Sequence, residues 1–184
     1  ALLKRAELVL VSGGALGISA AIAIALAHRF QPTLLLIGRS PAPQPEADWL
    51  HGLDEETAIK QAIHRYHADA KSPKEIEGVY QHTIANRQML QTIAAIDASG
   101  AKAIYRSVDI RSADELANTL ESVTNEYGPL RGIVHGAGVL ADGLIGDKTD
   151  QHFAAVLSTK CEGFINLLAA VDDSPPAFIV ACSS

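Results

Sequence analysis

The sequence predicts an α/β protein with a doubly wound parallel sheet of the Rossmann type. Short apolar runs rich in branched side chains alternate with longer helical stretches along most of the 184 residues, and this alternation is typical of parallel sheets. A cluster of glycines follows the first apolar run, at the junction where such folds bind nucleotides. The fifth expected strand comes last, so we expect a sheet truncated after that strand.

The expected elements follow one another in βα order. The run ELVLVS (7–12) predicts a strand that ends at glycines, residues 17–29 are rich in Ala and Ile and predict a helix, and TLLLIG (33–38) predicts a second strand. These three elements form a βαβ unit with a right-handed crossover. Three further helices are expected: one at about 89–99, one that begins at the capping box Ser112-x-x-Glu115, and one at about 150–171. Three further strands are expected at 101–110, 130–136 and 177–184.

Residues 41–88 interrupt the alternation and predict a helical insertion within a single domain of residues 1–184. The segment opens with the turn-rich PAPQP and continues as a polar, histidine-rich stretch with a break at Ser72-Pro73. His64 and His67 lie three residues apart on an expected helix. No cysteine or tight carboxylate set completes a metal site with them, so we expect a solvated helical face and no metal.

Composition and charge exclude several classes of function. The chain is 48% hydrophobic and 20% charged with a net charge of -6, as in ordinary globular proteins, and it lacks the clustered Lys and Arg of nucleic-acid-binding surfaces. The longest apolar run contains the glycines and no signal-peptide pattern is present, so we expect neither a membrane nor a nucleic acid as partner. Two cysteines without metal-ligand spacing favour a reducing, cytoplasmic location.

The glycine cluster predicts a phosphate-binding loop. Gly13 can take a positive φ in the tight turn, Gly14 lets the backbone approach a pyrophosphate, and Gly17 opens a helix whose N-terminal amides favour an anion. Ser19 stands where the nucleotide fingerprint has its helix-packing glycine. A tight turn with small residues for helix–sheet packing would give the same pattern.

The next two strand ends suggest how a dinucleotide is recognised. Gly38-Arg39-Ser40 follows the second strand, where an NAD-selective fold carries an acidic residue, and an arginine there can bind a 2′-phosphate, which favours NADPH. Asp109 ends the third strand and can accept a hydrogen bond from an adenine amino group. A solvated arginine and a turn aspartate ahead of the next helix are the alternatives.

Five motifs together carry a family resemblance. The stretches SGGALGIS, IGRS, SVDI, IVHGAGVLAD and AFIVACSS occur in this order. With them the chain resembles the ketoreductase domain of modular polyketide synthases and polyunsaturated fatty acid synthases, within the short-chain dehydrogenase/reductase superfamily. The resemblance implies NADPH-dependent reduction of a 3-ketoacyl thioester to the 3-hydroxyacyl thioester. The implied partners are the acyl carrier protein that holds this thioester and the other synthase domains.

The resemblance also implies roles for individual residues. Lys160 and Ser184 match two members of the family's active site, although by themselves they would be taken for a solvated helix lysine and a polar strand end. Leu140 and Asp142 match a Leu-Asp-Asp signature for a D-configured, usually (3R), product, from which Ala141 departs. The residues that match or adjoin the family's cofactor site are Ser12, Gly13, Gly14, Gly17, Ile18, Arg39, Ser40, Asp109, Ile110, Gly136, Ala137 and Gly138.

One member of the family pattern lies outside this sequence. The proton-donating tyrosine of the family belongs to a Tyr-x-x-x-Asn stretch beyond the position of Ser184, so residues 1–184 alone are expected to be inactive. Two other functions remain open at this point. A stand-alone short-chain dehydrogenase would have Tyr-x-x-x-Lys downstream, and a non-catalytic nucleotide-binding module would have no tyrosine there.

Overall fold

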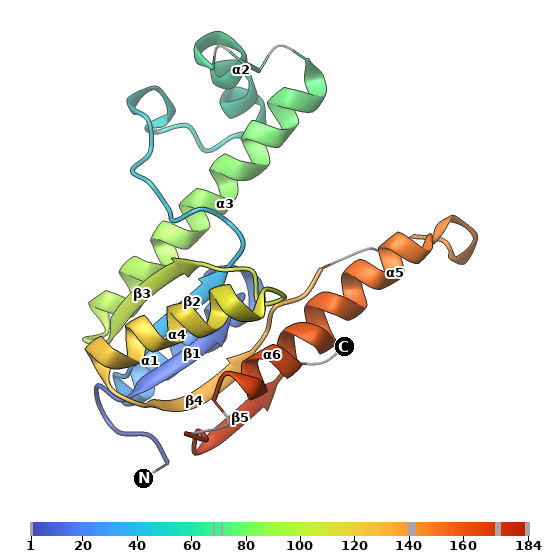
Figure 1. Ribbon diagram of the computed structural model, residues 1–184. Coiled ribbons are helices and arrows are strands. Elements are labelled where there is room, and N and C mark those ends of the chain that lie inside the picture. The colour runs from blue at the N-terminus through green and yellow to red at the C-terminus, as the bar shows by residue number, and fades with distance from the viewer. Residues whose placement is uncertain (1, 68, 71, 140–142, 172–173, 183–184) are drawn as a thin grey trace. The chain divides into compact units, whose positions relative to one another are not determined.

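The computed structural model describes residues 2–67, 69–70, 72–139, 143–171 and 174–182 (Figure 1). Its centre is a parallel sheet in the order β3-β2-β1-β4-β5, which confirms the predicted doubly wound α/β fold. The strands are β1 (Leu8–Ser12), β2 (Thr33–Gly38), β3 (Lys102–Ser107), β4 (Leu130–His135) and β5 (Phe178–Ala181).

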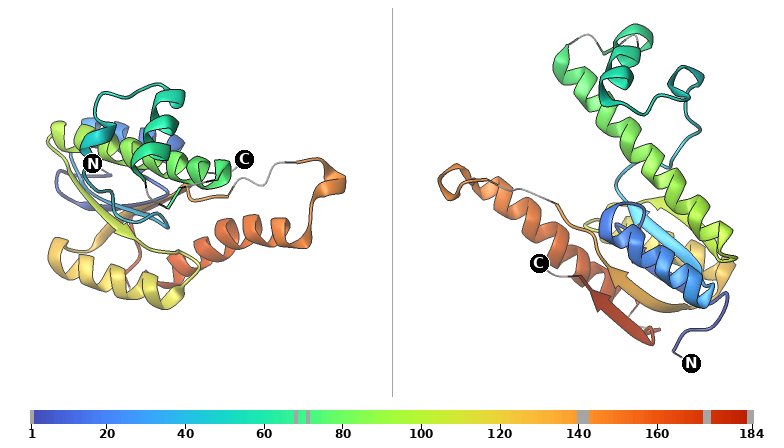
Figure 2. Two further views of the ribbon diagram at one scale, coloured as in Figure 1. Left: turned by 90° about the horizontal axis from the view of Figure 1, so that it is seen from above. Right: turned by 180° about the vertical axis from the view of Figure 1, so that it is seen from behind.

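Helices cover both faces of this sheet. Figure 2 shows α1 (Gly17–Phe30) and the end of α3 (Pro73–Ala98) on one face, with α4 (Ala113–Tyr127) and α6 (Gly163–Ala169) on the other. Every residue of the central strand β1 is buried, because both of its faces are covered and it pairs with β2 and β4. The buried core on the α4 side includes Leu10, Leu35, Ile133, Leu116 and Leu167.

The expected capping box at Ser112 is wrong. Ser112 is the residue before α4, yet its side chain caps no backbone N–H. The Glu115 carboxylate instead accepts from the backbone N–H of Asp109 at 3.3 Å. A capping box is present elsewhere, at the start of α3: the N–H of Ser72 donates to Glu75 Oε2 at 2.7 Å, and the N–H of Glu75 donates to Ser72 Oγ at 3.3 Å. The expected break at Ser72-Pro73 is therefore a helix start.

The long helix expected at 150–171 is divided into three parts. It contains α5 (Asp150–Leu157), a π-helical turn η3 (Ser158–Glu162), and α6. The Thr149 hydroxyl accepts from the N–H of His152 at 3.2 Å and so fixes the start of α5. A π turn inserts one extra residue into a helical turn, and such turns are frequent at functional sites.

Pro43–Gln91 forms a second compact unit, which we call the helical unit; Ala1–Ala42 and Thr92–Ser184 form the sheet unit. The helical unit contains a short 3₁₀ turn η1 (Asp48–Leu50), α2 (Glu56–Tyr66) and residues 73–91 of α3. Leu50, Ile59 and Ile63 are its buried centre. His67 follows the last residue of α2 in an extended conformation, so it does not share a helix face with His64.

Arg87 connects the parts of the helical unit. Its side chain is only 18% exposed. The guanidinium pairs with Glu46 and donates to the carbonyls of Leu53 at 2.6 Å and Leu50 at 3.0 Å. The hydrogen bond to Glu46 raises the pKa of Arg87. A planar fork of donors serves three acceptors here, which an ammonium group cannot reproduce.

Replacing this arginine tests its role. We expect Arg87→Lys to lower the free energy of opening of the helical unit by about 1–3 kcal/mol, because two partly buried carbonyls lose charged donors. Amide exchange of residues 48–54 measures this, with the exposed Lys74→Ala in the same helix as the control. Unchanged exchange in Arg87→Lys would contradict the assignment.

Candidate functional site

The candidate site lies at the carboxyl ends of the strands, where the strand order reverses. From β1 the chain goes through β2 to β3 on one side, and β4 and β5 follow on the other, so the loops after β1 and β4 diverge at this point (Figure 1). In open α/β sheets, ligands bind in the crevice at such a switch point. The residues predicted from the sequence at 12–18 and 136–138 fall at these two strand ends.

Each glycine of the loop after β1 has its own structural reason. Gly13 has a φ of 68°, and a Cβ there would lie 3.1 Å from the Cα of Ala137. A Cβ on Gly14 would lie 2.7 Å from the Val11 side chain, whereas Gly17 has a φ of 57° with nothing within 4 Å. Gly13 and Gly14 therefore permit close packing, while Gly17 leaves open space at the start of α1.

The start of α1 leaves its backbone donors available. Leu16 precedes the helix and provides no side-chain cap, and no acidic residue lies in the first turn. The unpaired N–H groups and the helix dipole of such an end favour an anion. Ile18, in the same turn, is 78% exposed, which places an apolar side chain beside these donors.

A buried hydrogen-bond cluster joins the ends of β1 and β4. Ser12 Oγ accepts from the N–H groups of Gly136 and Ala137, each at 3.2 Å, and lies 2.8 Å from Nδ1 of His135. Both lone pairs of this hydroxyl are thus used, so its proton is donated to Nδ1. The other ring nitrogen, Nε2, lies 3.0 Å from the carbonyl oxygen of Lys160, which can only accept. The imidazole is therefore neutral, with its proton on Nε2.

Lys160 lies in the π turn and points to the loop after β4. Its Nζ donates to the carbonyl of Ala137 at 3.1 Å, and a Cβ on Gly138 would lie 3.7 Å from it. The lysine is half-buried. The structure thus brings the ammonium group of Lys160 to the 136–138 stretch.

Ser19 explains why residue 136 is a glycine. Ser19 is buried in the first turns of α1, and a Cβ on Gly136 would overlap its hydroxyl and lie 3.1 Å from its Cβ. The residue at the position of the fingerprint's packing glycine therefore packs against the loop after β4. The small side chain of Ser19 fits at this position only because Gly136, which lies against it, has no side chain.

The loop after β2 is held by side chains of β3. The Tyr105 hydroxyl donates to the carbonyl of Ser40 at 2.8 Å, and Ser107 Oγ donates to the carbonyl of Arg39 at 3.4 Å. Burial raises the pKa of Tyr105, so it remains a donor at neutral pH. The Arg39 side chain is exposed, beside the same edge of the sheet as the glycine loop.

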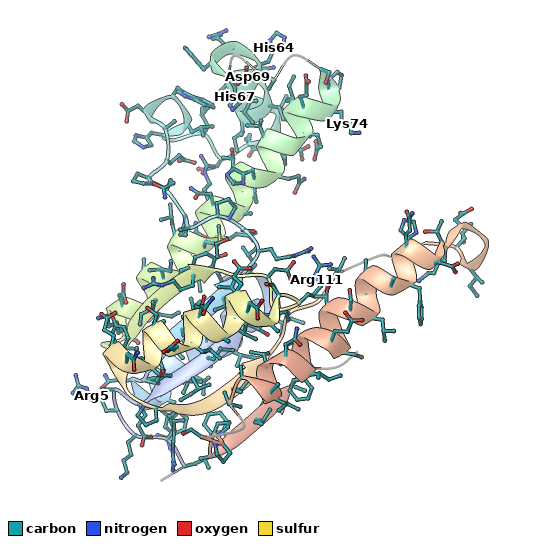
Figure 3. The ribbon with its side chains drawn as sticks, viewed as in Figure 1. Arg5, His64, His67, Asp69, Lys74 and Arg111 are labelled. Atoms are coloured by element: carbon teal, nitrogen blue, oxygen red, sulfur yellow. The ribbon has the colours of Figure 1, made fainter. Side chains whose placement is uncertain are left out.

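Asp109 has a partner that the sequence analysis missed. Arg111 donates to its carboxylate through the backbone N–H and Nε, each 3.0 Å from Oδ1, and through Nη2, 2.6 Å from Oδ2. The hydrogen bond to Arg111 lowers the pKa of Asp109. An adenine amino group would therefore share this carboxylate with Arg111, whose place beyond the end of β3 is seen in Figure 3. The sequence signal for this ion pair is an arginine, Arg111, two residues after Asp109.

Other predicted residues are placed as follows. Ile110 is buried, and a Cβ on Gly163 would overlap its side chain, so α6 packs closely on the segment after β3. Leu140, Asp142 and Ser184 lie outside the described residues. Among the residues that the structure describes, no three His, Cys, Asp or Glu side chains gather as a metal site. None of the described helices has the length and apolar character needed to cross a bilayer.

Known proteins share both this sequence pattern and this fold. The family model described as the KR domain matches residues 80–184. This chain belongs to the KR domain family. A polyunsaturated fatty acid synthase subunit from Thraustochytrium sp. is 32% identical over 192 residues that cover 99% of this chain and 7% of that protein. Polyketide synthase PksL of Bacillus subtilis is 35% identical over 92 residues, which make up 50% of this chain and 2% of PksL.

Solved structures give the same assignment for the fold. An N-terminal ketoreductase from the macrolactin assembly line superposes with a TM-score of 0.72 and 26% identity over 99% of this chain. A ketoreductase domain from the bacillaene assembly line superposes with a TM-score of 0.68 and 25% identity over 97% of this chain. This KR domain chain spans 29% and 33% of those two chains. The short-chain dehydrogenase/reductase fold expected from the resemblance is thereby confirmed.

The contact between Ser19 and Gly136 is testable in this KR domain. We expect Gly136→Ala to lower the free energy of unfolding by about 1–3 kcal/mol through overlap with Ser19. Ser19→Gly alone costs about 1 kcal/mol as a helix glycine, yet the double variant should be more stable than the sum of the two changes predicts. Denaturant unfolding of all four proteins measures the coupling. Strictly additive values would show that the overlap is not the cause.

The neutral state of His135 predicts a pH dependence. Burial lowers the pKa of His135 below its usual 6.5, so below that pH the unfolded chain binds more protons than the folded one. The free energy of unfolding should then fall with decreasing pH, by up to about 1.4 kcal/mol per pH unit. Unfolding curves between pH 5 and 8 test this. His135→Gln should flatten the dependence, and an equal slope in both proteins would refute it.

Proposed function

We propose that this KR domain binds NADPH at the carboxyl edge of its sheet and takes part in reducing a 3-ketoacyl thioester carried by an acyl carrier protein. The observation that carries the proposal is one hydrogen-bonded cluster, in which Ser12 at the end of β1 contacts the 136–138 stretch and His135, and His135 contacts the carbonyl of Lys160 in η3. This cluster supports a site that combines the groups proposed to bind phosphate with the charge of Lys160. The synthase relatives, which are much longer than this chain, support the carrier-bound substrate and neighbouring synthase domains as partners.

The described residues fit a dinucleotide phosphate. The uncapped start of α1 offers backbone N–H groups to a pyrophosphate, and Gly17 leaves space in front of them. Arg39 is exposed at the end of β2, where its guanidinium can form two hydrogen bonds to a 2′-phosphate. Ser12, Gly13, Gly14, Ile18, Ser40, Asp109 and Ile110 are assigned to the same cofactor site.

The chemistry assigned to the chain is positioning and electrostatic. NADPH supplies the hydride when it is bound. Lys160 brings a positive charge to the 136–138 stretch, where it would orient a ribose hydroxyl and favour the developing negative charge on a carbonyl oxygen. Ser184 would donate a hydrogen bond to that oxygen. The proposal assigns no proton donor among residues 1–184, and it therefore predicts cofactor binding without turnover for these residues alone.

Two finer assignments complete the proposal. By the resemblance, Leu140 and Asp142 would favour a D-configured 3-hydroxyacyl product, and the two cysteines without metal-ligand spacing favour a cytoplasmic location of the protein. The synthase relatives favour a module of a synthase over a stand-alone dehydrogenase, since the likeness to a fatty acid synthase protein extends over 99% of this chain.

Cofactor titration tests the proposal. We expect the folded chain to bind NADPH at least about tenfold more tightly than NADH, because a phosphate–arginine contact contributes about 1.5–3 kcal/mol. Arg39→Ala should remove most of this preference by weakening NADPH alone. Arg5→Ala is the matched control, since Arg5 is exposed at the opposite end of the sheet (Figure 3). Nicotinamide fluorescence gives the dissociation constants.

Two results would contradict the proposal. Equal affinity for NADPH and NADH would show that Arg39 does not select the cofactor. Failure of a folded chain to bind either one, with circular dichroism confirming the fold, would show that the glycine loop serves packing.

A further inference from the structure

The imidazole of His135 has no role in the chemistry proposed above, yet it is the most deeply buried polar ring of the site. The residue has no exposed surface, and its ring stacks on Phe164 with 5.3 Å between the centroids. A buried polar ring is costly unless both nitrogens are paired. Here both are paired, with Ser12 on β1 and with the Lys160 carbonyl on η3.

We propose that His135 is a positioning residue for Lys160, acting through the hydrogen bond from its Nε2–H to the carbonyl oxygen of Lys160. This inference rests on the proposed role of Lys160 in the cofactor site. Because the imidazole is neutral and Nδ1 receives the Ser12 proton, Nε2 is fixed as a donor. Ser12 and His135, at the ends of β1 and β4, thus determine that the atom bound in η3 is an acceptor. That acceptor is the backbone carbonyl oxygen of Lys160 itself.

Two hydrogen bonds hold Lys160, one to its side chain and one to its backbone carbonyl, and a bound ligand would replace only the side-chain bond. Its Nζ donates to the Ala137 carbonyl at 3.1 Å, and that bond must weaken when the ammonium group turns to a ribose hydroxyl. The bond from His135 reaches the backbone instead and is not in the path of a ligand. The backbone of Lys160 therefore keeps its place while the side chain exchanges partners.

The hydrogen bond from His135 reaches an irregular turn of the helix. Helical hydrogen bonding changes register at η3, where the N–H of Gly163 donates to the carbonyl of Ser158. Thr159 Oγ1 donates to the carbonyl of Ala155 at 2.9 Å and fixes the near side of the turn. At such an irregular turn a side chain from outside the helix can bond to a group of the helical ladder. His135 does so at the carbonyl of Lys160.

The test compares variants that separate positioning from general stability. His135→Phe keeps the ring and its stacking but loses the donor, whereas His135→Gln keeps an N–H donor. Ile133→Val, at a fully buried position of the same strand, is the control for stability. Lys160 is followed by NMR of ¹³C-methylated lysines, with Lys160→Arg to assign its signal, and η3 is followed by amide exchange of residues 159–163.

The proposal predicts a graded result. In His135→Phe the Lys160 signal should move toward those of exposed lysines and exchange in η3 should become roughly tenfold faster, as expected for a lost buried hydrogen bond. His135→Gln should lie between His135→Phe and the natural chain, and Ile133→Val should leave the Lys160 signal and η3 exchange unchanged. A Lys160 signal that responds equally to His135→Phe and Ile133→Val would overturn the proposal.

Two further measurements keep the outcomes distinct. If His135→Phe does not fold, ¹⁵N NMR of the natural chain decides: a proton on Nε2 supports the proposal and a proton on Nδ1 overturns it. NADPH affinity should fall about tenfold or more in His135→Phe, since small displacements of a positioned group have such effects. If the natural chain binds no NADPH, the proposed function fails, while the Lys160 signal still tests the positioning role.

Discussion

The hydroxyl of Ser12, buried between two strand ends, is the group on which the rest of the site depends. It accepts two backbone N–H groups from the loop after β4 and donates its proton to His135. A buried hydroxyl has one proton and two lone pairs, and all three are used, so each neighbour is fixed in one orientation. Removing this group would leave the N–H of Ala137 and one nitrogen of the buried imidazole without their partner, which costs more than one lost hydrogen bond. The N–H of Gly136 would keep the backbone carbonyl of Ser12 as an acceptor at 3.1 Å.

The consequences of this constraint extend in both directions from the switch point. Toward α1, the loop after β4 lies so close to the helix that Gly136 cannot carry a Cβ beside Ser19, and Gly13 meets Ala137 in the same way. Toward η3, the orientation of His135 selects the Lys160 carbonyl as its acceptor. One polar cluster thereby connects the uncapped start of α1 with the charged side chain of Lys160, and the proposed dinucleotide site depends on this connection.

Much of this arrangement is predictable from sequence, because it depends on local signals. The glycine cluster after an apolar run located the loop, and apolar runs located the five strands. Three features depend on tertiary contacts instead. The π turn looks like ordinary helix in the sequence, the Arg111 ion pair replaces the expected free carboxylate of Asp109, and Glu115 bonds to Asp109 and not to Ser112. Likewise α3 begins at Pro73, far ahead of the expected start, because apolar contacts within the helical unit stabilise a polar stretch that has little amphipathic pattern of its own.

Backbone NMR of the chain during titration with NADPH tests the central claim most directly, because it locates the ligand without assuming where it binds. The account predicts that the largest shift changes occur at Gly13, Gly17, Arg39 and the 136–138 stretch, with the Lys160 side chain responding together with them. Changes confined to the helical unit, or to the end of the sheet near Arg5, would contradict the claim that the Ser12–His135 cluster builds a cofactor site.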